Sequence, residues 1–455
     1  MASSRPQASL FQTDFPPEEF AARRAKVLDA IGSDAAALLQ GAQAVRGFEN
    51  FRQSNEFYYL CGVEVPQSYL LLDGRTRKTT LFLPDPAKIQ AASEGDTLAA
   101  LAPEVTASLT GVDAVCRVEA LSDQLKGLKV LFTPHSPAEG RTVSRGEALR
   151  ANRIIASDLW DGEIPREARF IGLLRARHPQ AEIRDLTPTL DRLRLVKSPR
   201  EIDLLRRAGR LSGLALMGAA RATRPGVFEY QLAAIGSFVF LANGARGEGY
   251  RPIAPTGANI WFSHYFRNDS QLQDGDFFLY DHAPDLGYYT SDIGRMWPVN
   301  GTYSPLQREL YGYVVQYHRT LLKRIRPGVT AAQIMDEAAA EMSTVVAATR
   351  FSKPIYEAAA RKMLEFRGHL SHPVGMAVHD VGNYHAQPLA PGIVFTVDPQ
   401  MWAPEEKLYV RCEDTVVVTE DGIENFTRFV PLEMDDFEAL LREPGLLQKH
   451  NVIWT

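Results

Sequence analysis

The stretch Leu279–Arg295, which reads LYDHAPDLGYYTSDIGR, places Asp281 and Asp292 on either side of a turn. Its central residues 284–287, Pro-Asp-Leu-Gly, are typical of a turn, and the apolar residues on both sides are typical of strands. The spacing therefore predicts a hairpin that brings the two carboxylates to one place. Because carboxylates at short range repel each other unless cations lie between them, this segment indicates a metal site.

Two later segments place further acidic residues in apolar, strand-like runs. Asp398 lies in FTVDPQ and Glu413 in VRCEDTVVV. Burying a charge in such a run is costly unless a partner neutralises it. Four inward carboxylates and one imidazole would hold two divalent ions about 3.5 to 4 Å apart. Mainly oxygen ligands with one nitrogen favour manganese, with cobalt, iron and zinc as alternatives.

Histidines and cysteines support oxygen and nitrogen as the ligand atoms. Four of the ten histidines lie between His369 and His385. The three cysteines, at positions 61, 116 and 412, are odd in number and widely spaced. This spacing argues against a disulfide framework and against a cysteine-rich zinc site.

Length and composition are those of a globular protein with two domains. The chain has 455 residues, of which 45% are hydrophobic and 23% charged. With a net charge of −5 there is no basic signature, so we expect no nucleic-acid partner. The sequence begins without a signal-peptide pattern and has no run of about 18 apolar residues, so we expect a cytoplasmic protein that does not bind membranes.

The first half of the chain alternates helical and strand patterns, which predicts an α/β domain. The sharpest boundary is at Ser198-Pro199, where Ser198 and Glu201 match a capping box and predict a helix that begins at Pro199. We therefore expect an N-terminal domain over residues 1–190 and a C-terminal domain over 191–455. The elements expected in the first domain are helices at 15–31, 146–153 and 166–177 and strands at 36–39, 69–72, 79–83 and 130–132.

The second half groups strands at both ends with helices between them, which favours an α+β domain over a βαβ series. Arg411 and Glu413 alternate along one expected strand, so their side chains face the same side and predict a salt bridge. Cys412 between them would face the core. The strands expected are 250–254, 277–281, 291–298, 394–398 and 409–419, and long helices are expected from about 305 and 331.

Five segments in order resemble the pita-bread metallopeptidases, and within them aminopeptidase P and the Xaa-Pro dipeptidases (prolidases). The resemblance implies an α+β C-terminal domain of the pita-bread (creatinase/aminopeptidase-like) fold, preceded by a smaller α/β N-terminal domain. That first domain would restrict substrate access and contribute to a homodimer. The segments are FRQSNEFYYLCGVEVP (51–66), RLVKSPREIDLLRRA (194–208), SDIGRMWPVNG (291–301), HPVGMAVHDVG (372–382) and VRCEDTVVVTEDG (410–422).

The resemblance also implies a role for each residue of the site. Asp281 would chelate one metal ion, Asp292 and Glu413 would bridge both, and His372 and Asp398 would bind the other. Asp398 would also accept a proton from the attacking water. His264 and His379 would surround the scissile bond, and Arg411 would help order the site. We also expect Arg411 and His369 to contact the substrate.

The chain departs from the family near this site. The motif Glu-Pro-Gly is here Asp398-Pro399-Gln400, and Gly294 replaces the usual Thr beside the second Asp. His282-Ala283 replaces an apolar-Gly pair, and Gly368-His369 reverses the usual order. Because Asp is one methylene shorter than Glu, we expect altered substrate preference, and we expect Asp398→Glu to raise Xaa-Pro cleavage.

Three functions fit the sequence. The first is a metal-dependent exopeptidase that hydrolyses the Xaa-Pro bond of peptides or dipeptides. The second is a creatinase-like amidinohydrolase, which shares the fold but works without metal. The third is a noncatalytic peptide-binding protein of the same fold. Retention of all five ligand positions favours the first.

Overall fold

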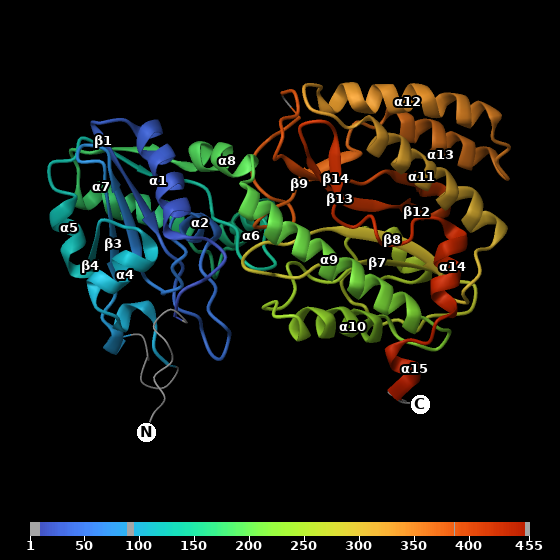
Figure 1. Cartoon of the computed structure of the whole chain (residues 1–455), viewed down its shortest axis with the longest axis horizontal. Helices are drawn as coiled ribbons and strands as arrows, with labels where there is room; N and C mark the ends of the chain where they lie inside the picture. Colours follow the sequence, from blue (N-terminus) through green and yellow to red (C-terminus); the bar gives the residue numbers. More distant parts are fainter. Residues whose placement is uncertain (1–9, 89–94, 386, 451–455) are drawn as a thin grey trace. The chain divides into compact units, whose positions relative to one another are not determined.

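A computed structural model describes residues 10–88, 95–385 and 387–450, and it divides into two compact units at Arg194/Leu195 (Figure 1). The predicted boundary at 190/191 falls inside helix α8. None of the helices in the described ranges is long and apolar enough to cross a bilayer.

The first unit is built on one mixed sheet, which in the described residues has the order β4-β3-β2-β1-β5-β6. β1 pairs with β2 antiparallel and with β5 parallel, so the α/β pattern expected for this domain is confirmed. Its strands are β1 (Ala35–Gln40), β2 (Tyr69–Asp73), β3 (Lys78–Leu83), β4 (Ala114–Arg117), β5 (Val130–Thr133) and β6 (Glu182–Asp185).

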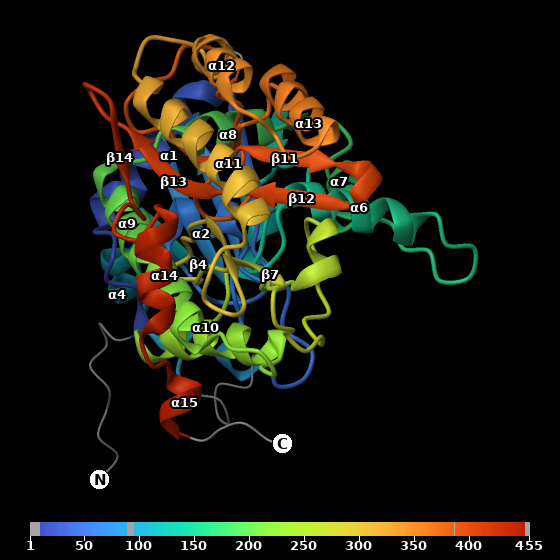
Figure 2. The same cartoon turned by 90° about the vertical axis from the view of Figure 1, so that its right-hand side faces the viewer.

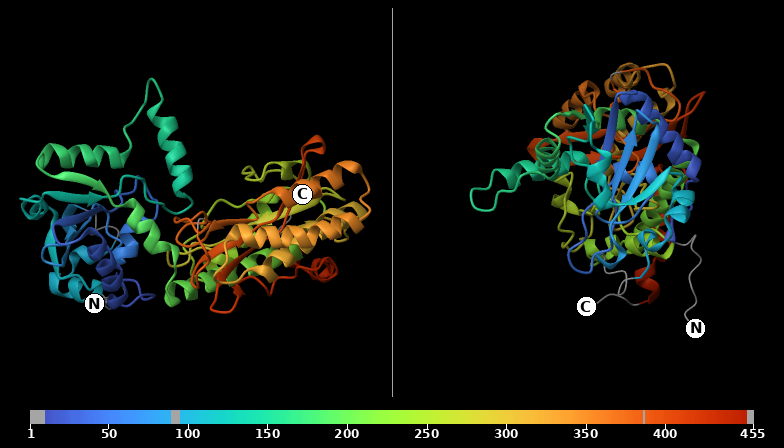
Figure 3. Two further views of the ribbon diagram at one scale, coloured as in Figure 1. Left: turned by 90° about the horizontal axis from the view of Figure 1, so that it is seen from above. Right: turned by 90° about the vertical axis from the view of Figure 1, so that its left-hand side faces the viewer.

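Helices flank this sheet, among them α7, whose Leu174 is buried in the core of the unit, while α6 and the loop after it project away from the sheet (Figure 3). Sequence patterns had not predicted β4 and β6, which are both only four residues long. The α-helices of the unit are α1 (Pro17–Ile31), α2 (Asn55–Cys61), α4 (Pro103–Thr110), α5 (Leu121–Gln124), α6 (Arg145–Ala156), α7 (Arg166–Arg177) and α8 (Thr187–Leu195), with short 3-10 turns at η2 (Pro86–Lys88), η3 (Leu98–Ala100) and η4 (Val118–Ala120).

The second unit is an antiparallel sheet between two helical layers (Figures 1 and 2). Its order in the described residues is β7-β8-β13-β10-β9, with β14 paired to β13 and a separate β11-β12 hairpin. Helices α9 and α10 lie on one face of the sheet, and α11, α12 and α13 lie on the other. The strands are β7 (Phe277–Asp281), β8 (Ile293–Pro298), β9 (Leu370–Pro373), β10 (Val394–Val397), β11 (Gln400–Ala403), β12 (Leu408–Arg411), β13 (Glu413–Val418) and β14 (Ile423–Asn425).

The helix that opens this unit begins at Pro199, as the capping box predicts. The Ser198 side chain accepts a hydrogen bond from the Glu201 amide, and the Glu201 carboxylate accepts one from the Ser198 amide. The helices are α9 (Pro199–Ala222), α10 (Glu229–Ala242), α11 (Pro305–Arg324), α12 (Ala331–Ala348), α13 (Pro354–Glu365), α14 (Met434–Arg442) and α15 (Leu446–His450), with 3-10 turns at η5 (Gly257–Trp261) and η6 (Pro404–Glu406).

The structure corrects three details of the predicted strands. Residues 250–254 form no strand and contribute only the isolated bridge of Ile253 to Asp281. The strand expected at 409–419 is interrupted at Cys412, which separates β12 from β13. The turn of the β7-β8 hairpin lies at Gly287 and Tyr288, both with positive φ, rather than at 284–287. A local pattern locates such elements but not the register that long-range pairing imposes.

Candidate functional site

The β7-β8 hairpin brings Asp281 and Asp292 together as expected. Asp281 pairs with Gly294 across the hairpin, and both carboxylates accept a hydrogen bond from the Tyr250 hydroxyl, at 2.5 Å for Asp281 and 2.8 Å for Asp292. Both side chains are buried, with Asp281 2% and Asp292 3% exposed. Tyr250 was not predicted as a site residue, because nothing in its local sequence distinguishes it from a core tyrosine.

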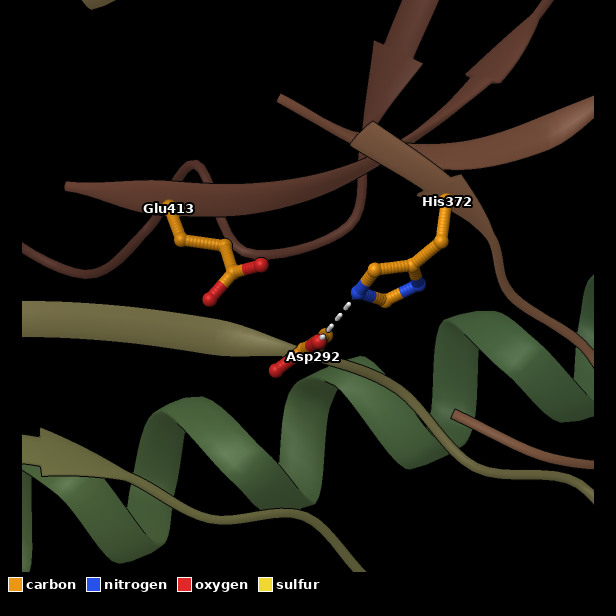
Figure 4. Close-up of side chains that lie close together, drawn as sticks. All are labelled: Asp292, His372 and Glu413. Carbon is orange, nitrogen blue, oxygen red and sulfur yellow. Dashed lines mark ion pairs between the residues drawn. The ribbon is translucent and has the colours of Figure 1, made fainter. Parts of the chain in front are cut away.

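Asp292 directly precedes β8, His372 lies in β9 and Glu413 begins β13, and the three side chains point toward one another (Figure 4). One donor atom from each lies within 4.8 Å of the others, a spacing that fits a shared metal ion. Nε2 of His372 lies 3.4 Å from Oδ2 of Asp292. The register explains the convergence, since Glu413 pairs with Gly294 on β8, two residues beyond Asp292.

Arg411 connects the remaining acidic residues to this cluster. Its Nη2 donates to Asp281 Oδ2 and to Glu413 Oε2, which confirms the predicted Arg411–Glu413 salt bridge. Its Nε lies 3.7 Å from Oδ1 of Asp398. One guanidinium therefore faces three of the four predicted carboxylate ligands, so a single positive charge offsets only part of their negative charge.

Burial shapes the ionisation of these groups. It raises the pKa of Asp292 well above its ordinary value, and repulsion from Asp281 raises it further. Burial also raises the pKa of Glu413 and of Asp398, although Arg411 acts in the opposite direction on both. Burial and His379 lower the pKa of His372 well below 6.5, which favours the neutral imidazole that binds metals.

The donor set therefore fits a pair of divalent cations. Four carboxylates and a neutral imidazole supply hard oxygen ligands and one nitrogen. Oδ1 of Asp398 is buried and has no hydrogen-bond partner among the described residues, a costly arrangement that a cation would relieve.

Two further predicted histidines lie in a row beside His372. The ring centroid of His379 is 4.1 Å from that of His372 and 6.0 Å from that of His264. The loop that carries His379 is anchored by a buried ion pair of 3.1 Å between Asp380 Oδ2 and Lys197 Nζ. Lys197, at the start of the unit, was not predicted to support the site because the pair spans 183 residues.

The structure does not bring His369 to this cluster. Its ring is fully buried against Tyr317 and Phe366, and Nε2 lies 2.7 Å from the carbonyl oxygen of Met363. This geometry argues against the substrate contact that we expected. His369 and His372 are three positions apart, and an odd separation along extended backbone directs side chains to opposite faces.

Comparison with known proteins places both units in described families. Residues 203–420 match metallopeptidase family M24, and residues 20–131 match the aminopeptidase P N-terminal domain. The chain is 31% identical over 452 residues to the Xaa-Pro aminopeptidase of Escherichia coli K12, covering 93% of this chain and 97% of the relative. It is 30% identical over 457 residues to human Xaa-Pro aminopeptidase 3, and the match covers 93% of this chain and 85% of the human protein.

A solved structure of E. coli aminopeptidase P with the inhibitor Pro-Leu has the same fold. Its TM-score is 0.75 at 27% identity, and the match covers 94% of this chain and 99% of that one. A further structure of the E. coli protein is described as zinc-substituted and in complex with product.

Proposed function

Because this chain belongs to metallopeptidase family M24, together with the Xaa-Pro aminopeptidases, we propose that it is a metal-dependent exopeptidase that hydrolyses the Xaa-Pro bond of peptides or dipeptides. The observation that carries the proposal is the convergence of Asp292, His372 and Glu413 beside Asp281 and Asp398. A noncatalytic protein has no need to keep four buried carboxylates and a half-buried imidazole together.

The metal centre would be dinuclear, and we propose manganese as its native ion. Asp281, Asp292, His372, Asp398 and Glu413 would hold the two ions, with Asp292 and Glu413 shared between them. When bound, such a pair lowers the pKa of a water molecule and polarises a peptide carbonyl. Metal analysis of protein purified without added ions tests the identity of the metal.

The side chains around this centre would divide the remaining work. Asp398 would accept the proton of the attacking water, because it is a carboxylate beside the cluster whose Oδ1 accepts no hydrogen bond from the described residues. His379 and His264 would donate hydrogen bonds to the tetrahedral oxyanion and to the substrate backbone. Arg411 would keep Asp281 and Glu413 in place through its two hydrogen bonds.

A peptide-library digest read by mass spectrometry tests this function. We expect cleavage before proline in the presence of Mn²⁺ and none after chelation. Asp292→Asn should lower kcat/KM at least about a hundredfold and lower the bound metal, because it removes a bridging ligand. Asp274→Asn, which alters an exposed carboxylate, is the matched control and should leave both unchanged.

Two other outcomes would replace the proposal. Chelator-insensitive hydrolysis of an amidino compound would favour the creatinase-like function. Peptide binding without turnover at saturating Mn²⁺ or Co²⁺ would favour the noncatalytic one.

We also propose a homodimer in the cytoplasm, in line with the expectations from sequence. Light scattering coupled to size-exclusion chromatography measures the oligomeric state, and fractionation of cells measures the location. A monomer at micromolar concentration would rule out the stable dimer.

A further inference from the structure

The carboxylate of Asp398 is held asymmetrically in the site. Gln400 Nε2 donates a hydrogen bond to Oδ2 of Asp398, whereas Oδ1 has no hydrogen-bond partner among the described residues. Asp398 is only 3% exposed, so water does not easily satisfy the second oxygen. One oxygen is thus fixed by a hydrogen bond, whereas the other accepts none from the described residues and lies 3.7 Å from Nε of Arg411.

The backbone holds Gln400 in position for this contact. β10 ends at Val397 and β11 begins at Gln400, with Asp398 and Pro399 between them. Gln400 is paired with Arg411 across the β11-β12 hairpin, and the Asp398 amide donates to the His369 carbonyl at 2.8 Å. Both ends of the Asp398–Gln400 hydrogen bond are therefore tied into β structure.

We propose that Gln400 is a positioning residue that compensates for the short side chain of Asp398. It holds Oδ2 so that Oδ1 is presented to the metal site, and it fills the space that a glycine at position 400 would leave. The two departures from the Glu-Pro-Gly motif then form one coupled change. This inference rests on the proposed metal-dependent function.

The chemistry of metal ligands supports this role. A carboxylate ligand whose second oxygen is hydrogen-bonded has a fixed orientation, and loss of such an outer partner typically costs about 10- to 100-fold in metal affinity or activity. Asp is shorter than Glu by one carbon–carbon bond of about 1.5 Å, so its orientation has less freedom to adjust. The amide of Gln400 already contacts the Asp398 carboxylate. A longer Glu side chain would therefore press against that amide.

This coupling changes what we expect of Asp398→Glu. By itself the substitution extends the carboxylate into the space of the Gln400 side chain, so cleavage should not rise. Only Asp398→Glu together with Gln400→Gly should restore a ligand of the usual length with room to reach the site.

A double-substitution cycle tests the proposal on the full chain. Four proteins are compared: the unaltered chain, Asp398→Glu, Gln400→Gly and the double variant. The first readout is Mn²⁺ affinity of chelator-stripped protein by titration calorimetry, and the second is kcat and KM on an Xaa-Pro peptide. We expect each single substitution to weaken Mn²⁺ binding by about 10- to 100-fold, and the double variant to recover most of the loss.

Gln400→Met and Gln273→Gly separate positioning from packing. Met keeps the size of the side chain but cannot donate, so it should weaken Mn²⁺ binding as much as Gly does. Gln273→Gly changes an exposed glutamine and should leave Mn²⁺ binding unchanged. Circular dichroism and melting temperature report whether each variant is folded.

Several results would overturn the proposal. One is an unchanged Mn²⁺ affinity in folded Gln400→Gly or Gln400→Met. Another is a cycle in which the two single effects combine to within about twofold of additivity. If the affinities are coupled but no Xaa-Pro peptide is cleaved, the proposed function fails while the positioning role stands.

Discussion

The backbone of Gly294 lies directly against the guanidinium of Arg411. A Cβ atom at position 294 would lie 3.1 Å from Nε and 3.3 Å from Nη2 of Arg411, and 3.2 Å from Cβ of Glu413. The absence of a side chain at this position therefore gives Arg411 the space in which it contacts Asp281 and Glu413.

Gly294→Thr should disturb this arrangement. The added side chain forces Arg411 to move, so we expect the chelator-treated protein to lose about 1 to 3 kcal/mol of unfolding free energy. Urea unfolding measures the loss. Gly172→Ala is the control, because nothing lies within 4 Å of a Cβ there, and it should not destabilise the protein. Equal stability of Gly294→Thr and the unaltered chain would contradict the prediction.

Arg145 is the centre of a buried ion cluster in the first unit. It lies 2.7 Å from Glu56, 2.9 Å from Glu139 and 2.6 Å from Asp191. Arg145→Gln removes the cation beside Glu56 and Asp191, whereas Glu139 keeps its ion pair with Arg194, and we expect a loss of about 3 to 5 kcal/mol in urea unfolding. The exposed pair of Arg75 and Asp73 offers the comparison, since Arg75→Gln should cost at most about 1 kcal/mol. Similar losses of unfolding free energy for Arg145→Gln and Arg75→Gln would show that burial does not determine how much the removal of an ion pair destabilises the protein.

The capping box at the start of α9 should be worth a measurable amount of stability. Ser198→Ala removes the side-chain oxygen that accepts from the Glu201 amide at 3.3 Å. We expect a loss of about 0.5 to 2 kcal/mol, measured by thermal or urea unfolding. Ser343→Ala, on the exposed face of α12, should change stability by less than about 0.5 kcal/mol. A Ser198→Ala protein as stable as this control would indicate that the cap contributes nothing.

The buried ring of His369 should make stability depend on pH. Burial lowers the pKa of His369 to about 4, whereas the unfolded chain binds this proton near the ordinary value of 6.5. The stabilisation that the neutral, buried ring of His369 gives to the folded protein is therefore complete above pH 6.5 and is lost as pH falls from 6.5 to about 4. The expected slope is about 1.4 kcal/mol per pH unit.

Urea unfolding at several pH values between 7.5 and 4.5 measures this effect. His369→Gln should reduce the slope by about 1.4 kcal/mol per pH unit, because Gln does not titrate, while His282 and His318, whose pKa burial also lowers to about 4, keep the remainder. His385→Gln, which replaces an exposed histidine, should retain the slope of the unaltered chain. An identical slope in all three proteins would exclude His369 as the source.

Much of the site was predictable because its chemistry depends on residue types that stand out in short segments of the sequence. Carboxylates in apolar strands, at Asp281, Asp398 and Glu413, indicate metal ligands wherever the strands finally pair. The hairpin of Asp281 and Asp292 and the start of α9 follow from turn and capping residues, which act over fewer than a dozen positions. The resemblance to known metallopeptidases supplied what periodicity could not, namely which histidine joins them.

The sequence by itself thus determined the two-domain organisation, the hairpin and the set of candidate metal-binding groups. Only the tertiary structure decided that Tyr250 joins two carboxylates, that Lys197 anchors the loop of His379, and that His369 turns into the core. It also decided that Gln400 supports Asp398 while Arg411 faces Gly294. These contacts depend on strand register and helix packing between distant segments, and local residue preferences carry no information about such pairings.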